Sequence, residues 1–566
     1  MSDEQYRRDY AHHLIEQVNK GHMTRRQLLV RASVFGFSAT AAGSLLAACG
    51  GSTSGGGSAS PAPSGTGMPA PVMGGTLKAV LPPSITDLDP VTIYDQGGIV
   101  LISQFCEYLI DLDDKNGLKP KLAESWSPNT DASVWTFKLR QGVVFSDGSA
   151  FEAADVAATM DRLVDPKSGS AALSALGGIL SPGGTVATDA ATVTFNLDKP
   201  FADFPFMVSA SSYNTVMLPR TYKGDWAKNP VGTGPWTMKE YVAKQKCTAV
   251  KNPTYWGKDA AGNQLPYMDQ IDWVLVQDES AANLQLQSGA IDLQPQTVFQ
   301  GSQALFADPN LRVDIYPGTG IREVAFNVNK DPWQDANLRQ AVAWCLDREA
   351  INKALYDGRS NLGYDTFWEP TVYPGSPTPA PRAQDYEKAK QLLSDAGKSG
   401  GLEITLTVAK YLENPQLAQL IQAQCEPAGI NVELDQISYE AIYAGTQSGP
   451  NTDTPWLSAP MVIVEWGSRP TPGVFAQAML LPDSAWSSSH WNNKDFATTF
   501  NQYMATSDEA TRTTLGTKLS QIQQDDTPIL VPFFITQLRT QKKTVYGVQG
   551  PGSFYCDVSQ AFVATA

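Results

Sequence analysis

The stretch LKPKLAESWSPNTDASVWTFKLRQGVVFSDGSAFEAADV, residues 118–156, contains strand and helix signals in close succession. The segment over residues 135–148 predicts β structure, and the apolar spacing that follows predicts a helix over residues 151–165. Phe151 and Asp155 are placed to start that helix. A second β segment, AATVTFNLDKPF at residues 190–201, comes after it. The stretch therefore predicts a helix flanked by two β segments.

The rest of the chain continues this alternation of short strands and helices. We expect a strand at 75–82, a helix leading into a strand at 96–113, a hairpin turn at 111–117, and strand, helix and strand at 271–295. Residues 335–358 and 383–397 predict amphipathic helices that end at Gly358 and Gly397. Residues 402–438 predict a β-α-β unit. The fold class is therefore α/β or α+β with mixed sheets.

Composition limits the classes of partner. The chain has 566 residues, of which 42% are hydrophobic and 17% charged, so it can bury a large core. The formal net charge is −15. Such an acidic chain argues against nucleic acid or an anionic membrane surface as the main partner.

The N-terminal segment is typical of an export signal. In TRRQLLVRASVFGFSATAAGSLLAACG, residues 24–50, Arg25 and Arg26 precede a weakly hydrophobic run that ends at Cys49. The segment resembles a bacterial lipoprotein signal of the twin-arginine type, which implies cleavage before Cys49 and a diacylglyceryl anchor there. We expect the signal over 1–48 and the lipidated cysteine with an uncharged Gly/Ser/Pro/Ala linker over 49–75. Export by the general secretory route and a short buried helix ending in Cys49 are the alternatives.

Cysteine and histidine usage excludes much chemistry. After Cys49 the cysteines are widely spaced without a C-x-x-C pair, which argues against zinc and iron–sulfur sites and leaves at least one thiol free. They are Cys106, Cys247, Cys345, Cys425 and Cys556. His490 is the one histidine beyond the signal, and it lies in a polar loop without a nucleophile elbow. We therefore expect no catalytic residue, no metal and no cofactor.

Several blocks in register resemble one family. The stretch quoted above, NPVGTGPWTMKEY at 229–241, NLRQAVAWCLDREAI at 337–351 and TKLSQIQQDDTPILVPFF at 517–534 are similar to the extracytoplasmic solute-binding proteins of the peptide, opine and nickel class of ABC importers. The resemblance covers residues 74–549. It implies a periplasmic-binding-protein-like fold whose two lobes close over a ligand about a hinge, with a small domain inserted in the first lobe.

The resemblance also implies domain boundaries and partners. Lobe I would comprise residues 76–118, 226–317 and 526–566, with the inserted domain at 119–225 and lobe II at 318–525. The implied partners are a small or peptide-like ligand and a membrane permease driven by a separate ATPase. We expect an extracytoplasmic monomer that contacts the membrane through its lipid anchor only.

VEWGSRPTP, residues 464–472, predicts a strand end that enters a rigid turn. The resemblance implies that the strand around Trp466 lines the cleft, and that peptide binders hold the ligand's ammonium with an aspartate three residues later. This chain has Arg469 there, which cannot accept a hydrogen bond from an ammonium but offers a planar fork to a carboxylate or phosphate. Three roles stay open: a clamp on an acidic ligand group, an internal ion pair with a carboxylate such as Glu465, or a solvated charge.

Other residues are weaker candidates for the cleft. Trp466 and Gly467 belong to the same strand end, and Tyr94 follows the turn where the family's first lobe faces the ligand. Arg322 and Asn327 lie on the strand that enters the second lobe, and Trp368 lies in a Pro-bounded loop. A place in the core is the alternative for the two tryptophans, and a place on the surface is the alternative for Tyr94.

Three functions of different classes stay open. The resemblance favours a lipid-anchored solute receptor of an ABC importer. The others are a binding protein repurposed as a sensor or scaffold, and an anchored secreted hydrolase.

Overall fold

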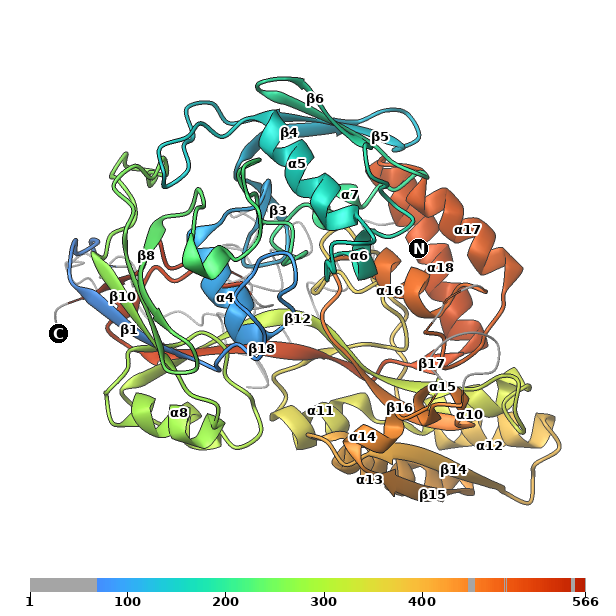
Figure 1. The fold of residues 1–566 in the computed structure, drawn as a ribbon. Helices are drawn as coiled ribbons and strands as arrows, with labels where there is room; N and C mark the ends of the chain where they lie inside the picture. The colour runs from blue at the N-terminus through green and yellow to red at the C-terminus, as the bar shows by residue number, and fades with distance from the viewer. Residues whose placement is uncertain (1–68, 446–452, 483, 485, 551–554, 565–566) are drawn as a thin grey trace, which may run out of the picture. The chain divides into compact units, whose positions relative to one another are not determined.

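The computed structural model describes residues 69–445, 453–482, 484, 486–550 and 555–564. Its main sheet (Figure 1) contains β1 (Thr76–Leu81), β8 (Trp236–Val242), β9 (Lys246–Lys251), β10 (Gln270–Leu275), β11 (Leu293–Gln294), β12 (Leu311–Phe326), β13 (Asn361–Leu362), β14 (Leu402–Ala409), β15 (Ile430–Ile437), β16 (Met461–Trp466), β17 (Ile529–Leu530) and β18 (Phe533–Lys542). The strand order is β15-β14-β16-β12-β18-β11-β1-β10-β9-β8, with β13 also paired to β18 and β17 to β12. Parallel pairs such as β1 with β10 lie beside antiparallel ones, which confirms the predicted mixed sheet.

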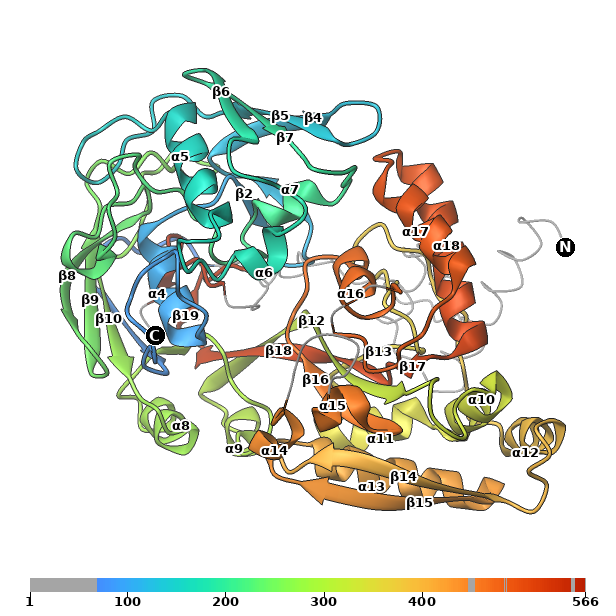
Figure 2. The same cartoon turned by 45° about the vertical axis from the view of Figure 1, so that its right-hand side comes forward.

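Strands β12 and β18 join the two halves of this sheet, one half around β1 and β8–β11 and the other around β14–β16. The first part of β12 pairs with β18, and after an irregularity between Tyr316 and Gly320 it pairs with β18 again at Gly320 and Ile321, while β16 pairs with it from Ile321 onward. A Cβ at Gly318 would lie 1.8 Å from the carbonyl oxygen of Ile535 on β18, so the strands can approach here only because residue 318 has no side chain. Figure 2 shows β12 and β18 running between the two groups of strands.

Residues 123–196, which include most of the stretch 118–156 and the β segment that follows it, form a small separate sheet with one covering helix. Strands β4 (Ala123–Pro128), β5 (Val134–Leu139), β7 (Thr192–Asn196) and β6 (Thr185–Asp189) are antiparallel in that order, and α5 (Ala153–Val164) packs against β6 and β7. Glu152 and Asp155 form a capping box at the start of α5, so the helix prediction is confirmed. The predicted β segment over 135–148 is too long, because after β5 the chain makes only an isolated bridge between Val144 and Ala150.

The second half of the sheet contains the predicted β-α-β unit. β14 and β15 are parallel, and α13 (Asn414–Cys425) connects and covers them. The single helix predicted over 335–358 is instead two, α10 (Ala336–Cys345) and α11 (Arg348–Tyr356). Leu346 is extended and the Asp347 side chain accepts from the Ala350 amide, so an internal N-cap divides the segment.

The remaining helices and short strands connect these layers. The helices are α4 (Gln96–Phe105), α6 (Leu173–Leu176), α7 (Phe204–Met207), α8 (Glu279–Gln287), α9 (Gln303–Phe306), α12 (Tyr386–Asp395), α14 (Tyr439–Ile442), α15 (Pro455–Ser458), α16 (Pro472–Met479), α17 (Lys494–Met504) and α18 (Glu509–Asp526). The hairpin β2 (Ile110–Leu112) and β3 (Leu118–Pro120) confirms the predicted turn, and β19 (Val545–Tyr546) pairs with β20 (Phe562–Val563). None of the helices in the described ranges combines the length and apolar character needed to cross a bilayer.

The five cysteines of the described ranges are buried and free. Burial raises the pKa of the Cys556 thiol to about 12, and it raises that of Cys247 to about 12 as well. Such thiols stay protonated at neutral pH and are poor nucleophiles. Within the same ranges no group of three or more His, Cys, Asp or Glu side chains could hold a metal ion.

Candidate functional site

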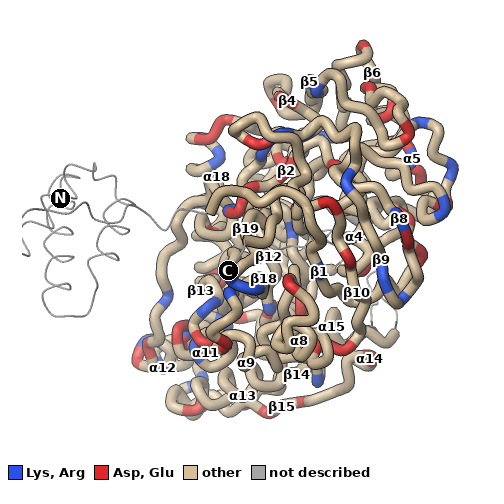
Figure 3. Tube along the Cα trace, turned by 90° about the vertical axis from the view of Figure 1, so that its left-hand side faces the viewer, with Lys and Arg blue, Asp and Glu red and all other residues tan. Residues whose placement is uncertain are grey.

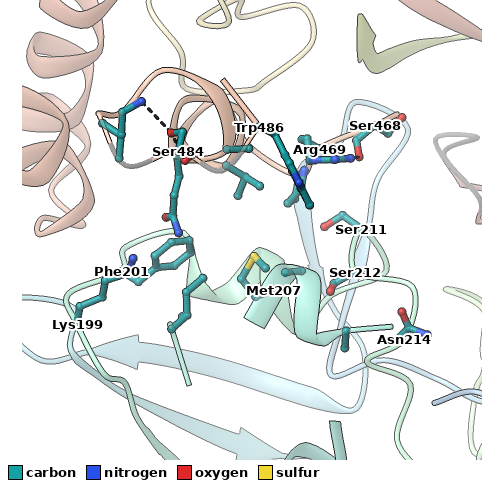
Figure 4. Close-up of a pocket in the computed structure, with 18 of the residues that line it drawn as sticks. Lys199, Phe201, Met207, Ser211, Ser212, Asn214, Ser468, Arg469, Ser484 and Trp486 are labelled. Carbon is teal, nitrogen blue, oxygen red and sulfur yellow. Dashed lines mark hydrogen bonds between the residues drawn. The ribbon is translucent and has the colours of Figure 1, made fainter. Parts of the chain in front are cut away.

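A cavity of about 750 Å³, here called the main cavity, is lined from two separate parts of the chain (Figure 4). One wall comes from residues 171–214, which include α6 and α7, and the other from residues 468–501, which include α16 and the start of α17. The polar lining residues are Lys199, Ser211, Ser212, Tyr213, Asn214, Ser468, Arg469, Gln477, Ser484 and Asn501. A smaller cavity of about 40 Å³ shares Arg469 and Tyr213 and extends toward Thr319 on β12. The site can therefore enclose a small organic molecule between two walls that meet at Arg469.

The turn that carries Arg469 is held from both sides. Strand β16 ends at Trp466, and α16 begins after Thr471, whose hydroxyl accepts from the Val474 amide and donates to an Asp203 carboxylate oxygen at 2.6 Å. The carbonyl of Arg469 accepts a hydrogen bond from the Tyr373 hydroxyl at 3.1 Å. A strand end followed by a rigid turn was the sequence prediction, and it is confirmed. The backbone of Arg469 is thus fixed by packing and hydrogen bonds before any solute enters.

The Arg469 guanidinium has no ion-pair partner among the described residues. Its Nη1 donates to the carbonyls of Gly467 and Ser468, both at 3.2 Å, and its central carbon lies 5.3 Å from the centre of the Trp466 ring. Burial lowers its pKa, but a guanidinium remains charged at any physiological pH. An arginine that is unpaired and lines a cavity can receive an anion.

The internal ion pair with Glu465 does not form. Glu465 accepts hydrogen bonds from Asn414 Nδ2 at 2.9 Å and from the Tyr443 hydroxyl at 3.1 Å. Successive residues of a strand point to opposite faces, which explains why Glu465 turns away from the cavity while Trp466 turns toward the turn that carries Arg469. Neither Glu465 nor Gly467 is among the lining residues described for the main cavity.

Trp466 supports the cavity wall from behind. Its ring contacts those of Trp486 and Phe475, with centroids 6.1 and 6.2 Å away, and Trp486 itself lines the cavity. Trp466 Nε1 donates to Glu323 Oε2 at 2.7 Å, and Glu323 is completely buried on β12. The second oxygen of Glu323 has no hydrogen-bond partner in the described ranges, and burial raises the pKa of this carboxyl to about 7.

Glu323 should make stability depend on pH. Its pKa is higher in the folded than in the unfolded chain, so its contribution is fully present below the unfolded value of 4.5 and is lost as pH rises through 7. As pH rises from 5 to 7, we expect the loss of this contribution to lower the free energy of unfolding by about 2 kcal/mol. Glu323→Gln should lack this component, because a neutral amide still accepts from Trp466 and does not titrate. Denaturant titrations at several pH values measure the difference.

Glu433→Gln is the matched control for this prediction, because Glu433 is exposed. It should show the wild-type pH dependence. If the free energy of unfolding changes equally with pH in wild type and Glu323→Gln between pH 5 and 7, Glu323 is not the group responsible for the pH dependence.

Arg322 and Asn327, both on or next to β12, lie in the interior. Arg322 forms a buried ion pair with Glu413 at 2.8 Å. Asn327 is buried, and its side-chain oxygen accepts from the Asn329 amide at 3.1 Å. Neither is among the described lining residues of the main cavity. Arg322 already has a protein countercharge, although its buried Nε has no hydrogen-bond partner in the described ranges.

Tyr94 and Trp368 are also separate from the main cavity lining as described. Tyr94 is 57% exposed and immediately precedes Asp95, the N-cap of α4. Trp368 is fully buried, with edge-to-face contacts to Phe496 and Tyr503. The surface and core alternatives therefore describe these two side chains better than a cleft position.

Sequence reasoning missed most of the first wall. Lys199, Tyr213 and Asn214 come from a segment without a motif, and only the folded chain brings it opposite Arg469. Trp486 belongs to the tryptophan-rich stretch around His490. An aromatic residue among polar ones was the feature of this stretch that could have indicated a binding site. His490 itself lies 2.7 Å from the Leu457 carbonyl oxygen through Nε2. Cys49, Arg25 and Arg26 lie outside the described residues.

Comparisons with known proteins add the family context. The family model for bacterial extracellular solute-binding proteins, family 5 Middle, matches residues 117–488. The glutathione-binding protein GsiB of Escherichia coli strain K12 is 26% identical over 466 residues, which cover 80% of this chain and 88% of GsiB.

Solved structures agree with the fold. The unliganded open form of the periplasmic murein tripeptide-binding protein MppA aligns with a TM-score of 0.74 at 23% identity, over 88% of this chain and 99% of MppA. The agropinic acid complex of AgaA from A. tumefacien R10 aligns at 0.65 and 22% identity, over 87% of this chain and 99% of AgaA. The periplasmic-binding-protein-like α/β fold with a small extra sheet is confirmed.

Proposed function

Because the chain belongs to the bacterial extracellular solute-binding proteins of family 5, we propose that it captures an acidic solute in the main cavity and delivers it to the permease of an ABC importer. The family consists of binding proteins that act outside the cytoplasm, so the chain is a receptor and not an enzyme. The observation that carries the acidic class is the unpaired Arg469 guanidinium in the cavity lining.

The solute class in this proposal is peptide-like or opine-like. GsiB is named for glutathione, MppA for a murein tripeptide, and AgaA was solved with agropinic acid. A guanidinium at position 469 favours a carboxylate or phosphate and disfavours a free ammonium, because both groups are cations. Solutes whose amine is acylated, and therefore uncharged, and whose carboxylate is free meet both requirements.

Delivery in this proposal uses lobe closure and a lipid anchor. We place the lobe boundary at residues 317/318, a choice supported by the irregularity in the pairing of β12 with β18 between Tyr316 and Gly320, after which β16 also pairs with β12. The diacylglyceryl group would be on Cys49, after a signal with Arg25 and Arg26. Mass spectrometry of the protein extracted from its host membrane tests the anchor, since the mature N-terminal cysteine would carry the added acyl mass.

A thermal-shift screen of the purified protein tests the function. The panel contains acidic opine-type conjugates, glutathione, and peptides with free or acetylated N-termini. A solute at about 100 times its Kd should add about 2.7 kcal/mol to the folded state. We expect the strongest stabilisation from acidic solutes without a free amine, and chromatography after incubation should recover them unchanged. Stabilisation by none of the panel, or by free-amine peptides alone, would contradict the proposal.

A further inference from the structure

The charges that line the main cavity are both positive. Among its described lining residues only Lys199 and Arg469 are ionised, and none is Asp or Glu. The whole chain carries 57 acidic and 42 basic residues, so an unselected lining would contain carboxylates more often than cations. Figure 3 shows acidic and basic positions interspersed along the chain on the side that it presents. The cavity therefore differs from the rest of the protein in the sign of its charge.

Lys199, which is exposed where it lines the cavity, can also receive an anion. No hydrogen bond or ion pair of its ammonium occurs in the described part of the chain. The neighbouring carboxylate of Asp198 accepts from the Ser181 hydroxyl at 2.9 Å, and its charge partly offsets the lowering of the Lys199 pKa by burial. Lys199 follows β7 and directly precedes Pro200, whose ring restricts the backbone at this point. A lysine in such a place acts as a point charge that several anion geometries can satisfy.

The two cations lie on different flanks of the cavity. Figure 4 shows Lys199 beside Phe201 on one flank and Arg469 beside Ser468 on the other, with Met207 between them in that view. The rest of the lining is largely apolar and includes Ile179, Val474, Leu481 and Trp486. A small inorganic anion would leave this apolar surface uncovered.

We propose that the main cavity takes a solute with two anionic groups separated by an apolar or aromatic spacer, Arg469 binding one group and Lys199 the other. This inference rests on the proposed function, and it adds a second specificity-determining residue to it. The fork of Arg469 suits a carboxylate held in one orientation, whereas Lys199 accepts the distal anion with less geometric demand. Solutes with one anion would bind through Arg469 and leave Lys199 unpaired.

A series of aliphatic α,ω-dicarboxylic acids from six to fourteen carbons, each with its monomethyl ester, tests the proposal on the purified protein by calorimetry. The ester retains the length and one carboxylate and removes the second charge. At the best chain length we expect the diacid to bind about tenfold more tightly than its ester. Lys199→Gln should reduce the diacid to the affinity of the ester and leave the ester unchanged. Lys167→Gln, which changes an exposed lysine outside the cavity, is the matched control and should have no effect.

The outcomes separate this inference from the proposed function. Equal affinity of diacid and ester, or an unchanged diacid affinity in Lys199→Gln, would overturn the second anion position and leave capture through Arg469 standing. The same holds if no diacid binds while acidic peptides or conjugates do. Failure of every diacid, ester, peptide and conjugate to bind would overturn the proposed function itself.

Discussion

Replacement of Arg469 by alanine should weaken the binding of a carboxylate solute by about 150-fold, or about 3 kcal/mol. The guanidinium is presented by a turn fixed on both sides and has no protein carboxylate to occupy it. Removing it leaves the solute's anion in a partly apolar part of the cavity without the charged donor that faced it, which is costly because the anion has given up water to enter. Calorimetry with the best acidic solute of the screen measures the loss.

Two further variants show whether the fork or the charge matters. Arg469→Lys retains the charge without the planar fork and should recover about tenfold of the lost affinity. Arg140→Ala is the matched control, because Arg140 also lies over an aromatic ring, that of Trp256, but does not line the cavity. Its affinity for the solute should equal that of wild type. An Arg469→Ala protein that binds the acidic solute normally would remove Arg469 from the site.

The position of Arg469 could be anticipated because its signal is local. Trp466, Gly467 and Pro470 frame it in the sequence and predict a held turn, and that turn is present between β16 and α16. No local pattern indicated a role for Lys199, because its place in the cavity depends on how residues 171–214 pack against residues 468–501. The pattern of residues along a segment predicts the conformation of that segment, but it does not predict which distant segment will pack against it.

The fold shows the same division between local and long-range information. The β-α-β unit of β14, α13 and β15 was predictable because its pattern of alternating and helical spacing lies within one stretch. The break between α10 and α11 was missed, although Asp347 carries the cap, because the apolar spacing continues across Leu346. Arg322 was a candidate for the cleft because its strand enters the second lobe, yet Glu413, distant in sequence, supplies its partner.

A buried cluster of one carboxylate and two guanidinium groups lies in the second half of the molecule. Asp365 is fully buried and pairs with Arg348, and its Oδ2 also lies 3.0 Å from Arg382 Nη1. Its Oδ1 accepts from the Val531 amide just before β18. Arg382 Nη2 donates to the Gln524 carbonyl near the end of α18 at 2.6 Å. The cluster thus connects α11 and α18 with the chain that enters β18.

Asp365→Asn should lower the free energy of unfolding by about 4 kcal/mol, which for a body of this size is a fall in Tm of about 4 °C. Two guanidinium groups would stay buried without the carboxylate that both of them contact, and a neutral amide cannot compensate both. Glu387→Gln is the matched control, because Glu387 pairs with Lys390 on an exposed face of α12, where loss of the pair costs about 0.5 kcal/mol or less. Scanning calorimetry of the three proteins measures the difference. If Asp365→Asn unfolds within 1 °C of wild type, the cluster does not hold these elements together, and their stability would have to come from apolar packing alone.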